Sequence, residues 1–406
     1  MAKKLLASVM AFALCLFVSA ADMVVKGKNG EDRKINVVDQ SKTFLEFKVL
    51  SDSTVEVTNK SSYPSYRGHK SITIPEKVRI EGKVYTVTSI GEDAFGGCSY
   101  LTSIKIPKSV TSIGKSAFSG CSYLTSIKIP EGVTSIGYSA FEGCRSLTNI
   151  KIPEGVTSIE KWAFEGCSSL EPELLVYDKG TKCYGWIGDK KKCTKVVIPE
   201  GVTSIGVDAF DGCDILEPKL LVYDKGTKCY GWIGDKKKCT EVVIPEGVTS
   251  IGYAAFERCG SLNSINIPES VTNIGDLTFY RCSSLTSIKI PEGVTSIGYA
   301  AFEGCGSLNS IKIPKSVTSI GKCAFDGCSS LTSIKISEGV TSIGEWAFKG
   351  CRSLTSINIP ESVTSIEKRA FSGCSNLEIV IDNSKENVKV GDGAFTGCKS
   401  VTWLKD

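Results

Sequence analysis

Residues 124–146 read LTSIKIPEGVTSIGYSAFEGCRS, and this 23-residue pattern recurs along most of the chain. Its clearest marker is a cysteine that returns every 23 residues, with two intervals of twice that length and a last interval one residue longer. A fixed period of this size indicates a solenoid or another repeat array. The marker cysteines are Cys98, Cys121, Cys144, Cys167, Cys213, Cys259, Cys282, Cys305, Cys328, Cys351, Cys374 and Cys398.

One repeat contains the signals of two short apolar segments and a turn. Apolar and polar residues alternate over residues 126–129, which predicts a short strand, and Pro130 ends it because proline donates no amide hydrogen. A second apolar pair lies within 133–136, and the apolar residues of 140–144 have the spacing of a single helical turn. A single repeat holds too few apolar residues for a core, so the repeats must stack. We predict a solenoid of about 14 repeats, with parallel strands and short helical or 3-10 turns.

The glycines of the pattern tolerate replacement. Glu160 and Glu367 replace the glycine that follows the isoleucine, and Arg258 and Arg281 replace the one before the cysteine. Because such side chains are disfavoured in a left-handed backbone, we expect neither position to require that conformation. Serine replaces the glycine after the proline at Ser109, Ser270, Ser316 and Ser362.

The first 20 residues have the features of a secretory signal. Lys3 and Lys4 precede an apolar stretch from Leu5 to Val18, and a small-residue cleavage site ends at Ala20. Its removal takes away two lysines and no acid, so the formal net charge falls from +4 to +2. The remaining chain has no basic block of the kind that nucleic-acid binding requires, and no segment apolar enough to span a membrane. The expected location is secreted or on the cell surface.

The pattern also divides the chain into parts. Residues 21–70 lack the repeat and are expected to form an N-terminal cap, followed by the solenoid over 71–375. Within it, residues 170–261 hold two nearly identical 46-residue blocks, each with an aberrant repeat that suggests a two-stranded excursion. Residues 376–406 read as the last repeat and a C-terminal cap that closes the open sheet edge.

The marker cysteines lie at an inward position, where parallel side chains of neighbouring repeats have poor disulfide geometry. We therefore expect a column of buried free thiols. The pairs Cys183/Cys193 and Cys229/Cys239 flank a plausible hairpin turn, and both the disulfide and the free forms remain open for them. Cys323 occupies a variable position and is expected to be exposed.

The chain lacks the residue patterns of catalysis and cofactor binding. His69 is the single histidine, so a Ser-His-Asp or Cys-His arrangement could be built only around it, and a surface role is expected instead. Clustered zinc ligands, a glycine-rich phosphate loop and a nucleophile elbow are missing from the sequence. We predict a protein that is not an enzyme and carries no metal or cofactor.

Two sets of residues are candidates for ligand binding. The first is a column of outward lysines: Lys105, Lys128, Lys151, Lys289, Lys312 and Lys335. Acids three residues further on can neutralise them, so this face is either self-neutralised or suited to multivalent contact with an extended partner: Glu131, Glu154, Glu292 and Glu338. The second set consists of aromatic residues in the aberrant repeats, which serve either as binding anchors or as packing across the irregular middle: Tyr184, Trp186, Tyr230 and Trp232.

The motif I-P-x-x-V-T-S-I-G-x-x-A-F-x-G-C-x-S-L resembles the BspA-like leucine-rich-repeat surface proteins, and the resemblance covers roughly residues 71–401. It implies a leucine-rich-repeat solenoid and adhesion at the cell surface, through fibronectin, fibrinogen or the surface of another cell. Two alternatives are a structural or antigenically variable surface protein without a specific ligand, and a carbohydrate-binding accessory module that depends on Trp186 and Trp232. The tandem blocks are what recombination of repeats would leave, and this favours the structural alternative.

Overall fold

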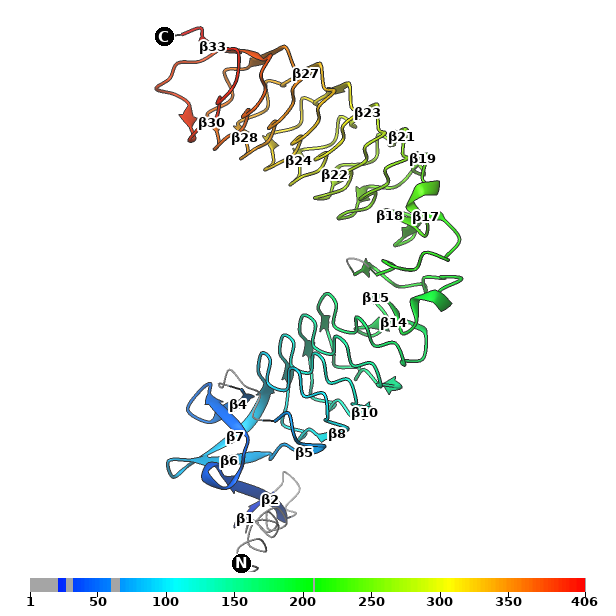
Figure 1. The fold of residues 1–406 in the computed structure, drawn as a ribbon, viewed down its shortest axis with the longest axis vertical. Helices are drawn as coiled ribbons and strands as arrows, with labels where there is room; N and C mark the ends of the chain where they lie inside the picture. The colour runs from blue at the N-terminus through cyan, green and yellow to red at the C-terminus, as the bar shows by residue number, and fades with distance from the viewer. Residues whose placement is uncertain (1–20, 27–31, 60–65, 207–208, 406) are drawn as a thin grey trace, which may run out of the picture. The chain divides into compact units, whose positions relative to one another are not determined.

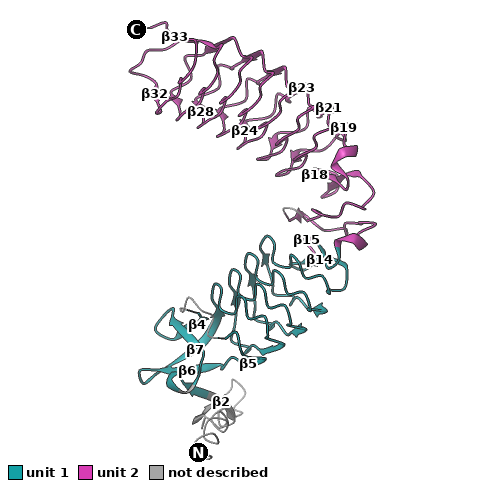
Figure 2. Cartoon of the chain, viewed as in Figure 1, with its two compact units in different colours: residues 1–179, 186–189 teal, residues 180–185, 190–406 magenta. Residues whose placement is uncertain are grey.

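The computed structural model describes residues 21–26, 32–59, 66–206 and 209–405, so the candidate signal at 1–20 lies outside the described residues. The chain forms two compact units (Figure 2), which we call the N-terminal unit (1–179 with 186–189) and the C-terminal unit (180–185 with 190–406). The fold is a parallel β-solenoid of about 14 repeats that are about 23 residues apart, which confirms the predicted fold class. The helices among the described residues are three short 3-10 segments: η2 (Gln40–Lys42), η3 (Lys190–Lys192) and η4 (Lys236–Lys238).

Each regular repeat contributes two short strands, and within each unit the strands of successive repeats stack into two rows. In Figure 1 these rows run along the C-terminal unit, with β21, β23 and β27 on one side and β22, β24 and β28 on the other. The first row, from the S-I-K segments, consists of β5 (Ser71–Thr73), β8 (Ser103–Lys105), β10 (Ser126–Ile127), β12 (Asn149–Ile150), β19 (Glu241–Val243), β21 (Ser264–Asn266), β23 (Ser287–Lys289), β25 (Ser310–Lys312), β27 (Ser333–Lys335), β29 (Ser356–Ile359), β31 (Glu378–Ile381) and β33 (Ser400–Trp403). The second row, from the T-S-I segments, consists of β7 (Lys83–Ile90), β9 (Ser112–Ile113), β11 (Ser135–Ile136), β13 (Ser158–Ile159), β16 (Ser204–Ile205), β20 (Ser250–Ile251), β22 (Asn273–Ile274), β24 (Ser296–Ile297), β26 (Ser319–Ile320), β28 (Ser342–Ile343), β30 (Ser365–Ile366) and β32 (Lys389–Val390).

The strands pair in a register that matches the sequence period. In the first row Ile311 lies opposite Ile334, and in the second row Ile320 lies opposite Ile343. Equivalent residues of neighbouring repeats are therefore neighbours in space. A column read from the sequence is thus a physical column of side chains.

The third side of each repeat is formed by the Ala-Phe segment. Here the amide of Cys121 donates to the carbonyl of Phe118 at 3.1 Å, which closes a tight turn of the 3-10 type. The amide of Phe118 itself donates to the carbonyl of Ala140 in the next repeat at 2.7 Å. The segment for which we expected one helical turn therefore forms tight turns whose intervening amides hold neighbouring repeats together.

Stacked phenylalanine rings form the centre of the core. Phe302 and Phe325 lie with ring centroids 5.3 Å apart and planes within 2° of parallel, and Tyr66 begins the stack of the N-terminal unit against Phe95 at 5.3 Å. Burial of one such side chain contributes on the order of 1.5–3 kcal/mol, and a favourable ring pair about 0.5–1.5 kcal/mol more. Because these rings pack on rings of adjacent repeats, this stabilisation exists only in the stack.

One expectation about the glycines was wrong. Arg258 and Arg281, with φ of 58° and 57°, adopt the same left-handed backbone as Gly327, with φ of 72°. The position therefore requires a left-handed residue in every regular repeat, and arginine is accommodated there at a cost in backbone energy. The expectation was based on the presence of arginine at this position, and the residue type alone does not show which backbone angle φ it adopts.

The glycine after the isoleucine is selected by close packing instead. A Cβ at Gly321 would lie 2.8 Å from backbone atoms of the preceding repeat, although the backbone there is not left-handed. Where glutamate occupies this position, its carboxylate becomes a hydrogen-bond acceptor for the preceding repeat, since Glu345 N donates to Glu367 Oε2 at 3.0 Å. Substitution at this position is thus compensated by a bond between repeats.

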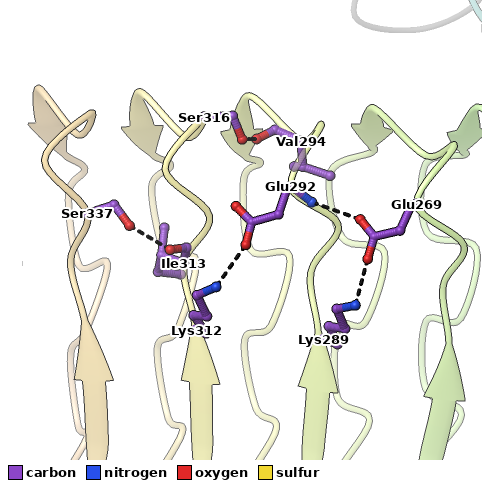
Figure 3. A network of polar contacts seen from close by, with 8 residues as sticks. All are labelled: Glu269, Lys289, Glu292, Val294, Lys312, Ile313, Ser316 and Ser337. Carbon is purple, nitrogen blue, oxygen red and sulfur yellow. Dashed lines mark hydrogen bonds and ion pairs between the residues drawn. The ribbon is translucent and has the colours of Figure 1, made fainter.

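Serine at the other glycine position also makes a bond between repeats. Ser316 Oγ donates to the carbonyl of Val294 at 2.5 Å, as Figure 3 shows, and Ser109, Ser270 and Ser362 make the equivalent bond. Ser337 replaces the proline of the pattern and donates to the carbonyl of Ile313 at 2.6 Å. These replacements satisfy a backbone acceptor that the consensus residues leave without a side-chain partner.

The ends of the repeat region carry additional strands. Before the first repeats lie β1 (Ala21–Lys26), β2 (Asp32–Asp39), β3 (Glu46–Val49) and β4 (Thr54–Thr58). The insertion in the first repeat is an antiparallel hairpin of β6 (Lys77–Ile80) with β7. At the other end β31, β32 and β33 continue the two rows, so the polar segment before Ala394 is part of the stack.

The aberrant repeats contain longer strands. They are β14 (Glu173–Tyr177) and β15 (Lys182–Ile187) in the first block, and β17 (Lys219–Tyr223) and β18 (Lys228–Ile233) in the second. β17 and β18 form the antiparallel pair that the sequence suggested. However, β18 also pairs in parallel with β20, with Cys229 opposite Ile251. The hairpin is therefore built into the second row rather than projecting from the solenoid.

Candidate protein-binding surfaces

Three predicted lysines of the C-terminal unit form one continuous column. Lys289, Lys312 and Lys335 end strands β23, β25 and β27, lie opposite one another in register, and are exposed. Apolar neighbours on the strands, such as Ile311, point into the core. The alternation predicted from the sequence therefore places the ammonium groups on the outer side of the first row.

Two of these lysines are paired with an acid of the preceding repeat. Lys289 Nζ lies 2.6 Å from Glu269 Oε1, and Lys312 Nζ lies 2.8 Å from Glu292 Oε1 (Figure 3). Glu269 also accepts a hydrogen bond from the amide of Glu292 at 3.3 Å. The acids were expected to compensate the lysines of their own repeats, whereas the structure pairs them with the lysine of the next one.

The ion pairs shift the protonation of their partners. The hydrogen bond from Lys312 is the largest cause of the lowered pKa of Glu292, and that from Lys289 lowers the pKa of Glu269. The pKa of Lys289 is raised in turn, chiefly by its hydrogen bond to Glu269. This part of the face is therefore a neutralised ladder of alternating charges, and each exposed pair is weak.

The alternation breaks where a lysine follows the proline of the preceding repeat. Lys315 stands after Pro314 in the place that Glu292 holds after Pro291, so the carboxylate that Lys335 would meet is replaced by an ammonium. Within the described part of the chain Lys335 has no ion-pair partner. The sequence signal for this break is a single residue, the lysine in P-K-S-V (314–317) where P-E-S-V (268–271) has glutamate.

The N-terminal unit places its predicted lysines in the same way but without ion pairs. Lys105 ends β8, Lys128 directly follows β10 and Lys151 directly follows β12, and all three are exposed. Among the described residues none of them lies within ion-pair distance of a carboxylate. Lys108, after Pro107, occupies the position that an acid holds in the neutralised ladder.

A groove of about 940 Å³ runs beside these lysines in the N-terminal unit. Lys105, Lys108 and Lys128 line it together with Ile106 and Pro107. Residues of the N-terminal segment complete it, namely Val38 of β2 and Thr43. The groove thus brings Lys105 and Lys128, two predicted site residues, together beside an apolar surface that the repeat pattern did not predict.

The aromatic residues of the aberrant repeats are half-buried rather than exposed. In the second block the ring of Tyr230 packs edge-on against Phe210 at 5.8 Å, and its hydroxyl accepts a hydrogen bond from the amide of Ala209 at 3.0 Å. Trp232 packs against the core, and its Nε1 donates to the carbonyl of Asp235 at 3.2 Å. These contacts give both side chains a packing role.

The first block repeats this arrangement in part. Tyr184 and Trp186 lie on β15, and both are half-buried. Trp186 Nε1 donates to the carbonyl of Asp189 at 3.4 Å, as Trp232 does to Asp235 in the second block. The polar atom of each indole is therefore already used within its own hairpin.

A second groove, of about 580 Å³, lies beside the second hairpin in the C-terminal unit. Tyr230 and Trp232 line it with Tyr253, whose side chain is 45% exposed. Its charged lining is mixed and includes Asp235 and Arg258. The aromatic candidates therefore border a surface that a ligand could reach mainly through Tyr253.

Other surface aromatic residues were missed because they lie at variable positions of the repeat. Trp162 is 41% exposed, lies beside Tyr138 with centroids 5.2 Å apart and planes tilted by 56°, and has Lys161 Nζ 4.5 Å from its ring. Trp346 is half-buried, and the ammonium groups of Lys322 and Lys349 are 4.7 and 5.8 Å from its ring. Trp162 and Trp346 hold the same position of the repeat, which is left-handed, with φ of 61° and 58°.

The cysteines of the described residues are free, and all of them are buried except Cys398, which is half-buried. Cys193 and Cys239 are not bonded to Cys183 and Cys229, and each lies instead within hydrogen-bond reach of the next marker cysteine, Cys213 or Cys259. Both therefore belong to the marker column, which the two variant repeats continue. Cys323 is 6% exposed, so the expectation that it is exposed was wrong. Trp162 shares this left-handed position and is 41% exposed, so exposure there depends on the side chain and not on the backbone.

The described residues contain no cluster of three metal-ligating side chains, and none of their helices has the length and apolarity to cross a bilayer. His69, the single histidine, is half-buried and stacks on Phe44 with centroids 4.0 Å apart. Its ring therefore has a packing partner on the surface of the N-terminal segment.

Comparison with known proteins identifies the repeat. The family model of the BspA type leucine-rich repeat region matches residues 58–175, 88–217, 180–305, 235–323 and 295–405. No curated protein sequence matches the chain significantly.

Several solved structures are similar. A leucine-rich repeat protein from Bacteroides ovatus is 30% identical, with 87% of this chain and 91% of that chain covered and a TM-score of 0.39. A leucine-rich cell surface protein from Faecalibacterium prausnitzii is 28% identical over 91% and 97%, with a TM-score of 0.45. A leucine-rich repeat protein from Eubacterium ventriosum is 22% identical over 87% and 92%, with a TM-score of 0.52, and shares the fold. Since the family model covers most of the sequence in overlapping matches, the chain belongs to the BspA-type leucine-rich repeat family.

Proposed function

We propose that this protein is a secreted or cell-surface adhesin whose solenoid binds extracellular proteins of a host, such as fibronectin or fibrinogen, or the surface of another cell. Its membership of the BspA-type family supports a role in protein binding at a surface. The signal-like segment at residues 1–20 supports export.

The observation that carries the proposal is the in-register lysine column. Lys289, Lys312 and Lys335 follow one another on three successive strands of the row and are exposed on the same side. A surface of this kind offers the same contact many times, so that weak individual contacts add up along an extended partner. Lys289 and Lys312 form ion pairs and Lys335 forms none with any described residue, so the charge along this face is not uniform.

Binding to immobilised fibronectin, fibrinogen, collagen and a glycan panel tests the proposal. The analyte is residues 21–406, and surface plasmon resonance reports saturation and affinity. We expect saturable binding to at least one matrix protein. Absence of binding to every surface, with a folded protein, would instead support the structural alternative.

Two variants locate the contact. K289Q/K312Q/K335Q removes the lysine column, and deletion of residues 170–261 removes both variant blocks with their aromatic residues. The deletion joins Ser169 to Leu262 and keeps the register, because each block spans two periods. Loss in the lysine variant places the site on the first row, and loss in the deletion alone places it on the hairpins. Binding to glycans that depends on Trp186 and Trp232 would support the carbohydrate-binding alternative.

A further inference from the structure

The groove of the N-terminal unit combines unpaired cations with an apolar floor. Its volume is about 940 Å³, and the ammonium groups along it come from Lys105, Lys108 and Lys128. The floor includes the edges of Ile74 and Ile106, which are 3% and 9% exposed. Half-buried proline rings, Pro75 and Pro107 among them, complete it.

The lack of ion pairs has a cause in the sequence. In the C-terminal unit, Lys312 is neutralised by Glu292, the residue after the proline of the preceding repeat. The equivalent residue for Lys128 is Lys108, which adds a positive charge instead of removing one. Lys105 has Glu76 at its equivalent position, yet the two form no ion pair within the described chain.

Two glutamates, Glu76 and Glu131, also line the groove, so that three lysines face two acids there. The local charge is positive, although the whole chain is nearly neutral. Since these lysines form no ion pair with any described residue, an anionic partner can pair with them without displacing an internal bond.

We propose that this groove binds an acidic peptide segment in extended conformation, with carboxylates on the three lysines and an apolar side chain against the isoleucine and proline floor. The inference deepens the proposed adhesin function and rests on it for the nature of the partner. It assigns the binding of acidic peptide segments to one part of the solenoid, the groove of the N-terminal unit.

The spacing of the lysines fits an extended chain. Lys105 and Lys128 belong to successive repeats, which are separated by one strand spacing of about 4.8 Å. Side chains on one side of an extended peptide recur about every 6.6 Å, and the flexible lysine stems can cover the difference. A sulfated polysaccharide could meet the charges but has no apolar side chain for the floor, so the peptide fits both features.

The test is a titration of residues 21–406 into a short fluorescent peptide in which aspartate alternates with leucine. Fluorescence anisotropy is measured at about 0.15 M salt, where long-range attraction is screened. We expect saturable binding that K105Q/K108Q/K128Q weakens about tenfold, the order for loss of a few solvent-exposed charge pairs. The arginine variant K105R/K108R/K128R should retain binding, and circular dichroism confirms that each variant is folded.

Matched controls separate the groove from general charge attraction. K315Q removes a lysine with the same P-K-S-V context as Lys108 but outside the groove, and it should leave the affinity unchanged. Peptides of asparagine alternating with leucine, or of aspartate alone, should bind more weakly than the aspartate-leucine peptide. A loss in K315Q as large as that in the single variant K108Q, or equal affinity for the peptide of aspartate alone, would overturn the proposal.

A short heparin fragment tests the competing class of ligand. If heparin binds through the same lysines and the aspartate-leucine peptide does not, the groove is a sulfated-glycan site and the proposal is wrong. Matrix-protein binding that survives in K105Q/K108Q/K128Q, combined with no binding of the peptide, overturns this inference and leaves the adhesin function standing. Peptide binding without any binding to matrix proteins would support the groove as a peptide site and would contradict the adhesin function.

Discussion

The thiol of Cys305 donates a hydrogen bond to the carbonyl oxygen of Phe279, 3.2 Å away in the preceding repeat. The equivalent hydrogen bond, between residues 26 apart in the sequence, recurs in other repeats. It joins Cys121 to Phe95, Cys144 to Phe118, Cys167 to Phe141, Cys282 to Phe256, Cys328 to Phe302, Cys351 to Phe325 and Cys374 to Phe348. It gives the cysteine a specific role, because it is a second hydrogen bond to a carbonyl that also accepts from the amide of Cys282 in its own repeat at 3.1 Å, and it comes from the next repeat. The periodic cysteines are therefore connectors between repeats as well as small apolar residues.

Replacement of Cys305 should reveal the strength of this bond. Cys305→Val keeps an apolar side chain but removes the bond between repeats, while the amide of Cys282 still donates to the Phe279 carbonyl, so we expect a loss of about 0.5–1.5 kcal/mol in the free energy of unfolding. Cys305→Ser keeps a donor and should lose less. Urea denaturation followed by circular dichroism measures both variants.

Cys323→Ala is the matched control for that substitution. Cys323 is buried, its thiol makes no hydrogen bond to any described residue, and alanine occupies the same position at Ala254 and Ala300. We expect its unfolding midpoint to stay close to that of the parent protein. A larger loss in Cys323→Ala than in Cys305→Val would show that cavity formation, and not the hydrogen bond, dominates.

The buried thiols should be unreactive in the folded protein. Burial raises the pKa of Cys305 to about 12, and the pKa values of Cys98 and Cys323 to about 11, so few thiolates exist near pH 8. Reaction with Ellman's reagent should be slow until guanidinium unfolds the chain. Cys398, the half-buried member, should react first, and Cys398→Ala should remove that early phase. Rapid reaction of several thiols in the native protein would contradict the closed column.

Most of the fold could be predicted because each residue of the pattern has one physical role in every repeat. The isoleucines, phenylalanines and marker cysteines lie where their period placed them. Cys193 and Cys239 escaped prediction because the hairpins change the spacing, from 23 residues to 26 and then 20, while the thiols remain in the column. Counting along the chain cannot detect a column that continues through an insertion.

The candidate site could be predicted only as a set of positions. The strand alternation correctly made Lys105, Lys128 and Lys312 outward residues. It did not show which of them are neutralised, since that depends on the acid of the preceding repeat, such as Glu292 for Lys312. Nor could it show the groove, because Val38 comes from a segment outside the repeat.

At the left-handed position before the cysteine, removing a side chain should raise stability and adding one should lower it. Arg258→Gly relieves a side chain at φ 58° and should raise stability by up to about 1 kcal/mol, because its exposed ion pair with Glu257 is weak. Gly350→Ala should lower stability by about 1–2 kcal/mol. At Gly350 the nearest atoms are 3.9 Å from an added Cβ, so the cost comes from φ 72° alone. Thermal denaturation of both variants is the measurement, and a destabilised Arg258→Gly would refute the account.

The pairing of Glu292 with Lys312 predicts a stabilisation that depends on pH. Lys312 lowers the pKa of Glu292 in the folded chain, so the folded state holds its proton less tightly than the unfolded state does. The stabilisation is therefore complete above the ordinary glutamate pKa of about 4.3 and is lost as the pH falls through the lower folded value. Glu292→Gln should reduce the melting temperature near pH 7 and should match the parent protein in acid.

Glu338→Gln provides the control for this pH dependence. Glu338 holds the equivalent position one repeat after Lys315, and it forms no ion pair with any described residue. Its substitution should leave the melting temperature unchanged at both pH values. About 1 M salt should shrink the effect of Glu292→Gln, because an exposed pair is screened. If Glu292→Gln is as neutral as Glu338→Gln at every pH, the ladder of Figure 3 does not stabilise the solenoid, and its charges are available for a partner instead.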